Sequence, residues 1–308
     1  MGSKSLSRVD RITYFLLTIV GLISASFIVF ISIFIALKGV LPFLTDNLGL
    51  GSVSLFKFLT QTVWLNGPTF VSTAYGAGFL IVNTLYIAFL SLLISFPIGV
   101  LTALFIAKIA PKKIAGILRT IIELLSAIPS IVYGLVGVGF FLPIIYSLAR
   151  SFGYSSSGGS GTLATVFVLA LMSIPTITSI SEVSIRSVDQ SIEHASLALG
   201  ATFTQTRFKI TLLAAKSGIF SGAILAIGRS LGEATAVSLV AGNARSGPTF
   251  GLFDITSTIT STMLTGLKET QGIDYDIRFS LGIVLMVVIL LTNMILNYIK
   301  KKVGNVHA

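Results

Sequence analysis

Cysteine is absent from this 308-residue sequence, and histidine occurs only at His194 and His307. Without cysteine, neither a disulfide nor a thiolate-ligated metal site can form. The two histidines are far apart and belong to no metal-binding motif, so we expect no metal site. A G-x-x-x-x-G-K-[ST] motif is missing as well, so the chain is not expected to hold nucleotide phosphates in a P-loop.

Charged residues are also scarce. They make up 10% of the sequence, whereas hydrophobic residues make up 54% and the mean hydropathy is +0.96. Soluble domains contain roughly a quarter charged residues, so this chain lacks the polar surface that a water-exposed protein needs. We therefore predict an all-α polytopic membrane protein. The net charge of +10 forms no basic stripe with interleaved aromatic residues, so nucleic acid is not an expected partner.

Hydrophobic runs predict six transmembrane helices, since a spanning helix needs about 20 apolar residues. The runs lie at 12–37, within 79–107, within 120–149, at 162–181, at 217–241 and at 279–299. Lys and Arg are distributed unevenly over the connecting segments, with fourteen on one side of the membrane and six on the other. The positive-inside rule then places both termini in the cytoplasm.

We divide the chain into two parts and single out one loop. Residues 1–73 hold the first transmembrane helix and an extracytoplasmic segment, and residues 74–308 form the main transmembrane domain. The cytoplasmic loop at 182–216 has apolar residues at helical spacing in its first half and a break at Gly200. It could lie on the lipid surface, but its acidic residues, such as Asp189, would be repelled by anionic lipid. A helix–turn–helix docked on a partner protein is the better interpretation.

The sequence SIEHASLALGATFTQTRFKITLL at 191–213 resembles the loop through which ABC-type importer permeases contact their ATP-hydrolysing subunit. That loop contains Glu-Ala-Ala, then Gly, then Ile-x-Leu-Pro. Aligned on Gly200, His194 takes the position of the Glu and Leu213 that of the Pro, and both depart from the pattern. The resemblance implies that coupling to an ATPase rests on Glu193, His194, Ala195, Ser196, Gly200 and Ala201.

Two further segments are similar to the permeases of the phosphate-specific ABC importer. They are ELLSAIPSIVYGLVGV at 123–138 and GRSLGEATAVSLVAGN at 228–243. The outer motifs SLFKFLTQTVW and LFD resemble the PstC-type permease more than its PstA-type partner. The resemblance implies a type I, MetI-like permease fold in the cytoplasmic (inner) cell membrane. It also implies a transport subunit that is not an enzyme and binds no cofactor of its own.

The same resemblance implies a set of partners besides membrane lipid. They are a second, PstA-type permease, two PstB-type subunits that use ATP and Mg, and an extracytoplasmic PstS-type phosphate-binding protein. Phosphate is the implied substrate, with another oxyanion as the alternative.

Arg229 and Glu233 lie inside the fifth predicted span, where a charge costs about 3 kcal/mol by insertion scales. Their i, i+4 spacing puts them on one helical face, where they can pair, although the Arg-before-Glu order also favours partners from other helices. Such a pair could simply hold helices together, but intramembrane charges more often mark a substrate route. A guanidinium matches the oxygens of phosphate. We therefore expect Arg229 to form a transient anion site that Glu233 weakens.

Two secondary features of the predicted helices concern their packing. Arg119 and Glu123 form another i, i+4 pair, at the cytoplasmic end of the third span. Small residues allow transmembrane helices to approach closely. This approach is expected at four glycines of the fifth span, namely Gly218, Gly222, Gly228 and Gly232.

Two other classes of function compete with a permease. GRSLG at 228–232 satisfies G-x-S-x-G, so Ser230 could be the nucleophile of an intramembrane serine hydrolase. That motif needs a strand–turn–helix and a histidine within reach, whereas here it lies within a predicted helix. A self-sufficient channel or carrier would show two matching halves with broken helices, and the sequence has no such symmetry. An importer permease is therefore the preferred interpretation.

Overall fold

The computed structural model describes residues 8–45, 52–65 and 74–304, and within them the chain is almost entirely helical, as predicted. The longest helices are α1 (Arg8–Leu44), α3 (Gly78–Leu104), α7 (Thr162–Arg186) and α14 (Ile273–Gly304). Those of intermediate length are α4 (Lys112–Ala127), α6 (Leu142–Ser151), α8 (Gln190–Ala198) and α11 (Lys216–Gly232). The short ones are α2 (Leu55–Thr60), α5 (Ser130–Val136), α9 (Phe203–Gln205), α10 (Leu212–Ala214), α12 (Thr235–Val240) and α13 (Ile259–Leu264).

Wider and tighter helical turns interrupt or extend several of these helices. The π-helices are η1 (Phe105–Ile109), η2 (Gly137–Phe141) and η3 (Thr206–Thr211), and η4 (Leu267–Glu269) is a 3₁₀-helix. An antiparallel ribbon of β1 (Trp64–Leu65) and β2 (Ala74–Tyr75) adds a small element to the all-helical fold. In this ribbon the aromatic rings of Trp64 and Tyr75 make an edge-to-face contact. Both residues belong to a buried apolar cluster that includes Ile277 of α14.

The number of predicted spans agrees with the structure. In the described part of the chain, five helical segments are long and apolar enough to cross a membrane. They are Val9–Leu44, Gly78–Ile109, Ser130–Ser151, Thr162–Arg186 and Ile273–Lys302. A sixth span results if the helical pair Phe203–Ala214 and Lys216–Gly232, bent by 66°, is counted as one. The predicted fold of six membrane helices is thereby confirmed.

Two predicted boundaries are wrong, and the third span illustrates why. Helix α4 ends at Ala127, and the span begins only at Ser130, not within a continuous helix from residue 120. Pro129 lacks a backbone N–H and disfavours the α conformation at the residue before it, and Ile128 is accordingly extended. The Tyr133 hydroxyl donates to the carbonyl of Leu125 across this break at 2.6 Å.

The predicted fifth span, 217–241, is also not a single helix. Helix α11 ends at Gly232, Glu233 is extended, and the short helix α12 follows from Thr235. No proline causes this interruption. At this interruption the side chain of Glu233 accepts a hydrogen bond from Ala236, and its backbone carbonyl accepts one from Thr260.

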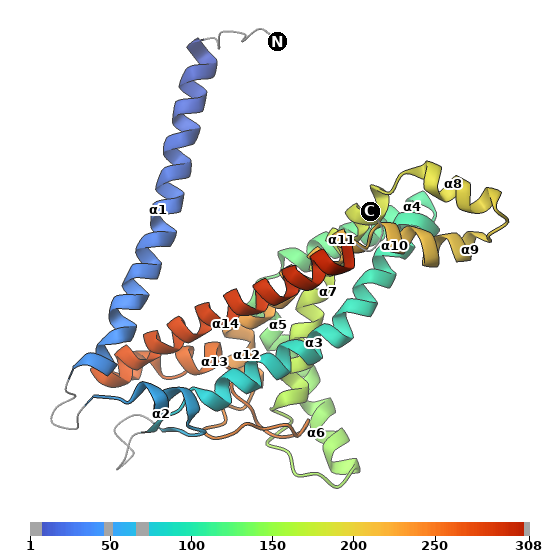
Figure 1. The fold of residues 1–308 in the computed structure, drawn as a ribbon. Coiled ribbons are helices and arrows are strands. Elements are labelled where there is room, and N and C mark those ends of the chain that lie inside the picture. The colour runs from blue at the N-terminus through green and yellow to red at the C-terminus, as the bar shows by residue number, and fades with distance from the viewer. Residues whose placement is uncertain (1–7, 46–51, 66–73, 305–308) are drawn as a thin grey trace.

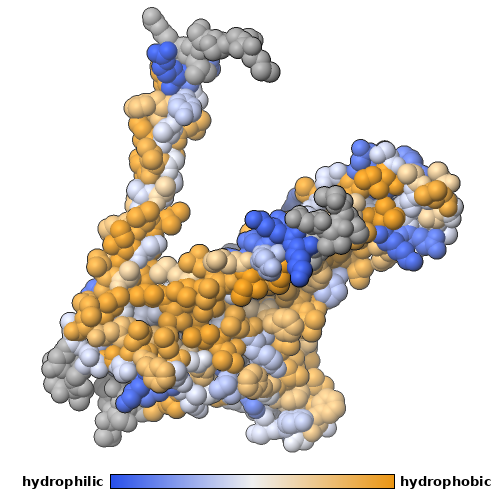
Figure 2. All heavy atoms as spheres, in the orientation of Figure 1, coloured by the Kyte–Doolittle hydropathy of each residue, from blue (hydrophilic) through white to orange (hydrophobic). Residues whose placement is uncertain are grey.

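Helix α1 extends away from the helical bundle and contacts α14 near its own C-terminal end (Figure 1). There Lys38 forms an ion pair with Asp276 at 3.4 Å, and the Ser280 hydroxyl donates to the carbonyl of Gly39 at 2.6 Å. The rest of α1 exposes large apolar side chains, for example Phe30 at 67%. Figure 2 shows hydrophobic surface along both α1 and α14. Such surface needs a lipid environment or another protein chain to cover it.

Helix α7 lies at the centre of the bundle. In the most apolar stretch of α7, 61% of the residues are buried inside the structure. The corresponding stretches of Gly78–Ile109 and Ile273–Lys302 are 39% and 17% buried. A methyl group on Gly99 of α3 would lie 2.7 Å from Ile177 of α7, so only glycine permits this close contact. Because Gly99 has no side chain, α3 and α7 can pack closely at this point, as helices with small interface residues do in membranes.

Helix α11 packs on α7 through some of its glycines only. A methyl group on Gly218 would overlap the side chain of Ser184, and one on Gly222 would touch Ile180. The prediction of close approach is therefore confirmed at these two positions. It is wrong for Gly228 and Gly232 within the described chain, because a methyl group placed there would meet no heavy atom within 4 Å outside the adjoining residues and backbone of its own helix.

Candidate functional site

Arg229 lies half-buried in the last turn of α11, inside the membrane bundle. Its Nη1 donates to Oγ1 of Thr176 in α7 at 3.4 Å, which confirms that it finds a partner on another helix. Tyr133 of α5 is near enough to interact with the guanidinium electrostatically. A cation in the last turn is favoured by the negative end of the helix dipole. Among the ion pairs of the described residues, none involves Arg229.

Glu233 does not share a helical face with Arg229, so the predicted i, i+4 pair is wrong. Its backbone is extended, with φ −74° and ψ 119°, and its Oε1 accepts the N–H of Ala236 at 3.0 Å. Its backbone carbonyl accepts the hydroxyl of Thr260 at 2.7 Å. The carboxylate thus caps the start of α12, where the positive end of a helix dipole favours negative charge.

Arg229 therefore lies in the last turn before a break in a membrane helix, and Glu233 lies within that break. Non-helical backbone at membrane depth is tolerated where it is surrounded by protein or lines a cavity. A pocket of about 340 Å³ lies beside the break, and Gly232, Ala234 and Thr260 contribute to its lining. Within the described residues, the hydroxyl of Thr176 is the one hydrogen-bond partner of the guanidinium.

Arg278 also lines this pocket, and its partners are backbone carbonyls that the hydropathy of the sequence did not predict. It is buried, with 4% exposure, and its Nη1 donates to the carbonyls of Thr262 and Met263 at 2.5 and 3.2 Å. These carbonyls lie in the last turn of α13, where backbone acceptors lack helical partners. Arg278 therefore caps α13 and fixes it on α14.

Ser230 lacks the surroundings of a hydrolase nucleophile. It lies in the last turn of α11, and its buried hydroxyl shares a 3.1 Å hydrogen bond with Ser173 of α7. His194 belongs to α8 in loop 182–216, and His307 lies outside the described residues. A G-x-S-x-G nucleophile needs a sharp strand-to-helix turn. Here the serine joins two packed helices instead.

Loop 182–216 begins later than predicted, because α7 continues to Arg186, and its remainder folds as a helix–turn–helix, as predicted. Asp189 caps α8, accepting the N–H of Ser191 at 2.8 Å. Gly200 has φ +87°, a conformation that glycine adopts without strain, and it ends the first helix. Thr202 and Gln205 then form a reciprocal capping box at the start of α9.

The six predicted coupling residues differ in their exposure. His194, Ala195 and Gly200 are exposed on α8 and the turn, together with the unpredicted Leu199, whose exposure is 90%. Figure 2 shows that polar and apolar residues alternate over this end of the molecule. Ala201 is half-buried. The exposed set forms a surface on which another protein could pack.

Glu193 and Ser196 instead face the chain itself. Oε1 of Glu193 lies 2.7 Å from Nζ of Lys108 and accepts the hydroxyl of Thr211 at 2.9 Å. The hydroxyl of Ser196 shares a buried hydrogen bond of 2.9 Å with that of Thr206. These two residues therefore hold α8 on neighbouring parts of the chain.

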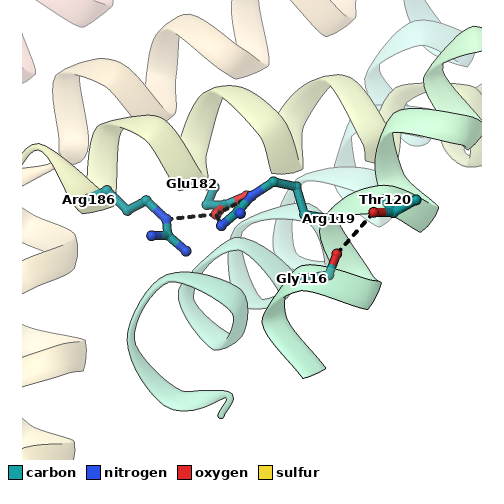
Figure 3. A network of polar contacts seen from close by, with 5 residues as sticks. All are labelled: Gly116, Arg119, Thr120, Glu182 and Arg186. Carbon is teal, nitrogen blue, oxygen red and sulfur yellow. Dashed lines mark hydrogen bonds and ion pairs between the residues drawn. The ribbon is translucent and has the colours of Figure 1, made fainter. Parts of the chain in front are cut away.

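A second carboxylate, the buried Glu182, organises the same end of the bundle. Figure 3 shows Arg119 of α4 and Arg186 of α7 converging on it. Both guanidinium groups donate to Oε1, at 2.6 Å from Arg119 Nη2 and 2.7 Å from Arg186 Nε. The predicted Arg119–Glu123 pair is therefore wrong, since Arg119 is bonded to Glu182. Glu123 acts on it only through space. This network fixes α4 on α7.

Several of these partners were not singled out by sequence reasoning. Lys108 entered it only as a topological charge, and Thr176 and Thr211 resemble any other membrane threonine. The positive charge of Lys108 next to the end of a predicted span indicated that it could pair with a carboxylate. No sequence motif or helical spacing identified that carboxylate as Glu193.

Comparisons with known proteins converge on one family. The family described as "Binding-protein-dependent transport system inner membrane component" matches residues 95–305. The probable ABC transporter permease protein YqgH of Bacillus subtilis (strain 168) is 34% identical over 289 residues, which is 93% of this chain and 89% of that protein. The phosphate transport system permease protein PstC of Pasteurella multocida (strain Pm70) is 34% identical, with 82% of this chain and 84% of the relative covered.

Solved structures show the same fold. A bacterial alginate ABC transporter, in complex with a periplasmic protein bound to an alginate pentasaccharide, has a chain that aligns with a TM-score of 0.64 at 18% identity. The alignment covers 97% of this chain and 96% of that one. An inward-facing MetNI methionine ABC transporter aligns with a TM-score of 0.51 at 19% identity, covering 74% and 94%.

Proposed function

This chain belongs to the binding-protein-dependent transport system inner membrane components and to their PstC-type phosphate permeases, and on that premise we propose that it forms part of the pathway by which an ATP-driven importer moves inorganic phosphate across a membrane. Transport is its function, and we propose that it catalyses no reaction itself. The observation that most supports this proposal is Arg229, an intramembrane cation without a carboxylate partner in the described chain.

The guanidinium of Arg229 suits a dehydrated oxyanion. Its planar donors match phosphate oxygens, and a partly buried site strengthens each charge-assisted hydrogen bond. Its contact with Thr176 is long, at 3.4 Å, so little is lost when an anion replaces it. We propose that Glu233 limits how long phosphate stays, because its negative charge lies in the helix break, four positions after Arg229.

We propose the following assembly. A second, PstA-type permease completes the pathway, and two PstB-type subunits bind ATP and Mg, so this chain needs no cofactor. A PstS-type extracytoplasmic protein delivers phosphate. The complex would lie in the cytoplasmic (inner) cell membrane, surrounded by lipid, with both termini of this chain in the cytoplasm. The exposed surface of α8, including His194 and Ala195, would dock on an ATPase subunit.

The experiment is uptake of radiolabelled phosphate by the purified complex in liposomes with ATP and the binding protein. Arg229→Gln should reduce uptake by about tenfold or more, because a hydrogen bond to a charged group contributes ~1.5–3 kcal/mol. Arg150→Gln is the matched control, since this exposed arginine ends a span without lying in the bundle. Uptake that survives Arg229→Gln in a correctly assembled complex would refute the proposed site.

Two further measurements separate the alternatives. Sulfate, arsenate and molybdate are added as competitors, and one that inhibits more strongly than unlabelled phosphate would identify another oxyanion as the substrate. Ser230→Ala should leave uptake nearly unchanged, whereas a hydrolase would lose its activity. Transport by this chain alone, without any ATPase, would instead indicate a carrier.

A further inference from the structure

Glu193 lies at a junction of three segments. It belongs to α8, Lys108 belongs to η1 at the end of α3, and Thr211 ends η3. A single oxygen, Oε1 of Glu193, contacts Nζ of Lys108 at 2.7 Å and Oγ1 of Thr211 at 2.9 Å. We refer to these contacts among Lys108, Glu193 and Thr211 as the brace.

The two charges of the brace are largely removed from water. The side chain of Lys108 is 15% exposed and that of Glu193 is 20% exposed, and Thr211 is fully buried. An exposed ion pair contributes little to stability, whereas breaking a buried pair leaves an uncompensated charge. The brace therefore resists separation of α8 from Lys108 and Thr211, which we refer to as its two anchors.

Both anchors of the brace lie on π-helices, η1 and η3. Single-turn π-helices are rare and frequently occur at functional sites, since the extra residue re-aims nearby side chains. A second contact to η3 lies close by, between the buried hydroxyls of Ser196 and Thr206. Helix α8 is thus held at two points on η3 and at one on η1.

The segments beyond the anchors lead directly to the membrane helices. Lys108 lies four residues after the end of α3, and Thr211 is followed by α10 and then by α11, which contains Arg229. A buried apolar cluster joins the adjoining ends of α3, α7 and α11, and it comprises Ala103, Leu104, Ile185, Val188, Ala215 and Ile219. Displacement of α8 would therefore move these ends together.

We propose that Glu193 is a positioning residue that transmits displacement of α8 to α3 and α11 at once, through Lys108 and Thr211. This inference rests on the proposed function, in which the exposed side of α8 docks on an ATPase subunit. Glu193 then acts inside the permease, behind the docking surface that contains His194 and Leu199.

The first test uses the assembled complex and compares Glu193→Gln, Lys108→Gln and the exchange Lys108→Glu with Glu193→Lys. In both single variants the ATPase should co-purify as with the wild type and hydrolyse ATP. Phosphate taken up per ATP should fall by about tenfold, as for other coupled sites. The exchange should restore much of that ratio. Lys112→Gln and Glu123→Gln, both exposed on α4, are the matched controls and should leave it unchanged.

The second test locks α8 to η3. Because the natural chain lacks cysteine, Ser196→Cys with Thr206→Cys creates its sole pair of thiols, at positions whose hydroxyl oxygens are 2.9 Å apart. If α8 and η3 move as one body, oxidation should form a disulfide and leave transport unchanged. Loss of transport on oxidation, restored by reduction, would show that the two segments separate during the cycle and would overturn the proposal.

The outcomes distinguish the brace from the proposed function. Loss of the ATPase from the Glu193→Gln complex would make Glu193 a docking residue and overturn the brace, as would normal coupling in that variant. A wild-type complex that fails to take up phosphate would refute the proposed function instead. In that case the disulfide yield in the chain alone still decides, since adding Glu193→Gln should lower it, and an unchanged yield would overturn the brace.

Discussion

Arg119 and Glu182 form an ion pair across 63 positions of sequence, with Nη2 of the arginine 2.6 Å from Oε1 of the carboxylate. The same oxygen accepts Nε of Arg186 at 2.7 Å (Figure 3). The Glu182 side chain is 8% exposed, so a buried anion is shared by two partly exposed cations. The hydrogen bond and the charge of Glu182 raise the pKa of Arg119 above its ordinary value.

Glu182→Gln should destabilise the permease by about 1–3 kcal/mol, because two guanidinium groups lose their shared carboxylate. The lower part of this range is expected, since solvent screens Arg119 and Arg186, whose side chains are 41% and 47% exposed. Thermal unfolding in detergent measures the change. Glu123→Gln, at an exposed position, is the control, and equal melting temperatures for the two variants would contradict the network.

Gly218→Ala and Gly228→Ala should have opposite effects, although both lie on α11. A methyl group at Gly218 overlaps Ser184, and overpacking of this kind costs about 1–3 kcal/mol. At Gly228 the methyl group has no neighbour within 4 Å, so alanine should gain up to ~1 kcal/mol from helix propensity. Unfolding of the two variants, measured side by side, tests the packing of α11 on α7, and a similar loss in both would contradict it.

Asp189→Ala should loosen α8, since the cap of this helix is lost. The N–H of Ser191 bonds to the carboxylate and lowers the pKa of Asp189 below its ordinary value. This contribution is complete above the ordinary pKa and disappears as the pH falls through the lowered one. Amide hydrogen exchange in α8 measures it.

Asp189→Asn is the matched control for that experiment, because asparagine also caps helices but does not titrate. The variant should keep slow exchange in α8 and lose the acid-dependent part of the wild-type behaviour. Fast exchange in Asp189→Asn, equal to that of the alanine variant, would show that the charge rather than the hydrogen bond holds the helix end.

Hydropathy predicted the membrane helices well because the cost of an unpaired backbone group in lipid leaves few other structures. The break before Ser130 has a local cause in Pro129, but the sequence did not predict it, because Pro97 and Pro175 lie inside unbroken helices. The break at Glu233 was not readable, because it depends on Thr260, 27 residues away. Its pairing with Arg229 was inferred from helical spacing, which fails once the helix ends at Gly232.

Long-range partners were beyond sequence reasoning for the same reason. Glu193 was correctly placed on a helix of loop 182–216, but its contact with Lys108 joins segments 85 positions apart, and spacing gives no information at that distance. The roles of Arg229 and the exposed residues of α8 stay predictions until they are measured.

The contact between α1 and α14 has a consequence for biosynthesis. The carbonyl of Gly39 is bonded to Ser280, so these partners leave the ribosome 241 residues apart. Helix α1 exposes apolar side chains along most of its length and can partition into the bilayer as soon as the translocon releases it. It must then remain in the lipid until α14 is inserted, and only then can α1 and α14 make this contact.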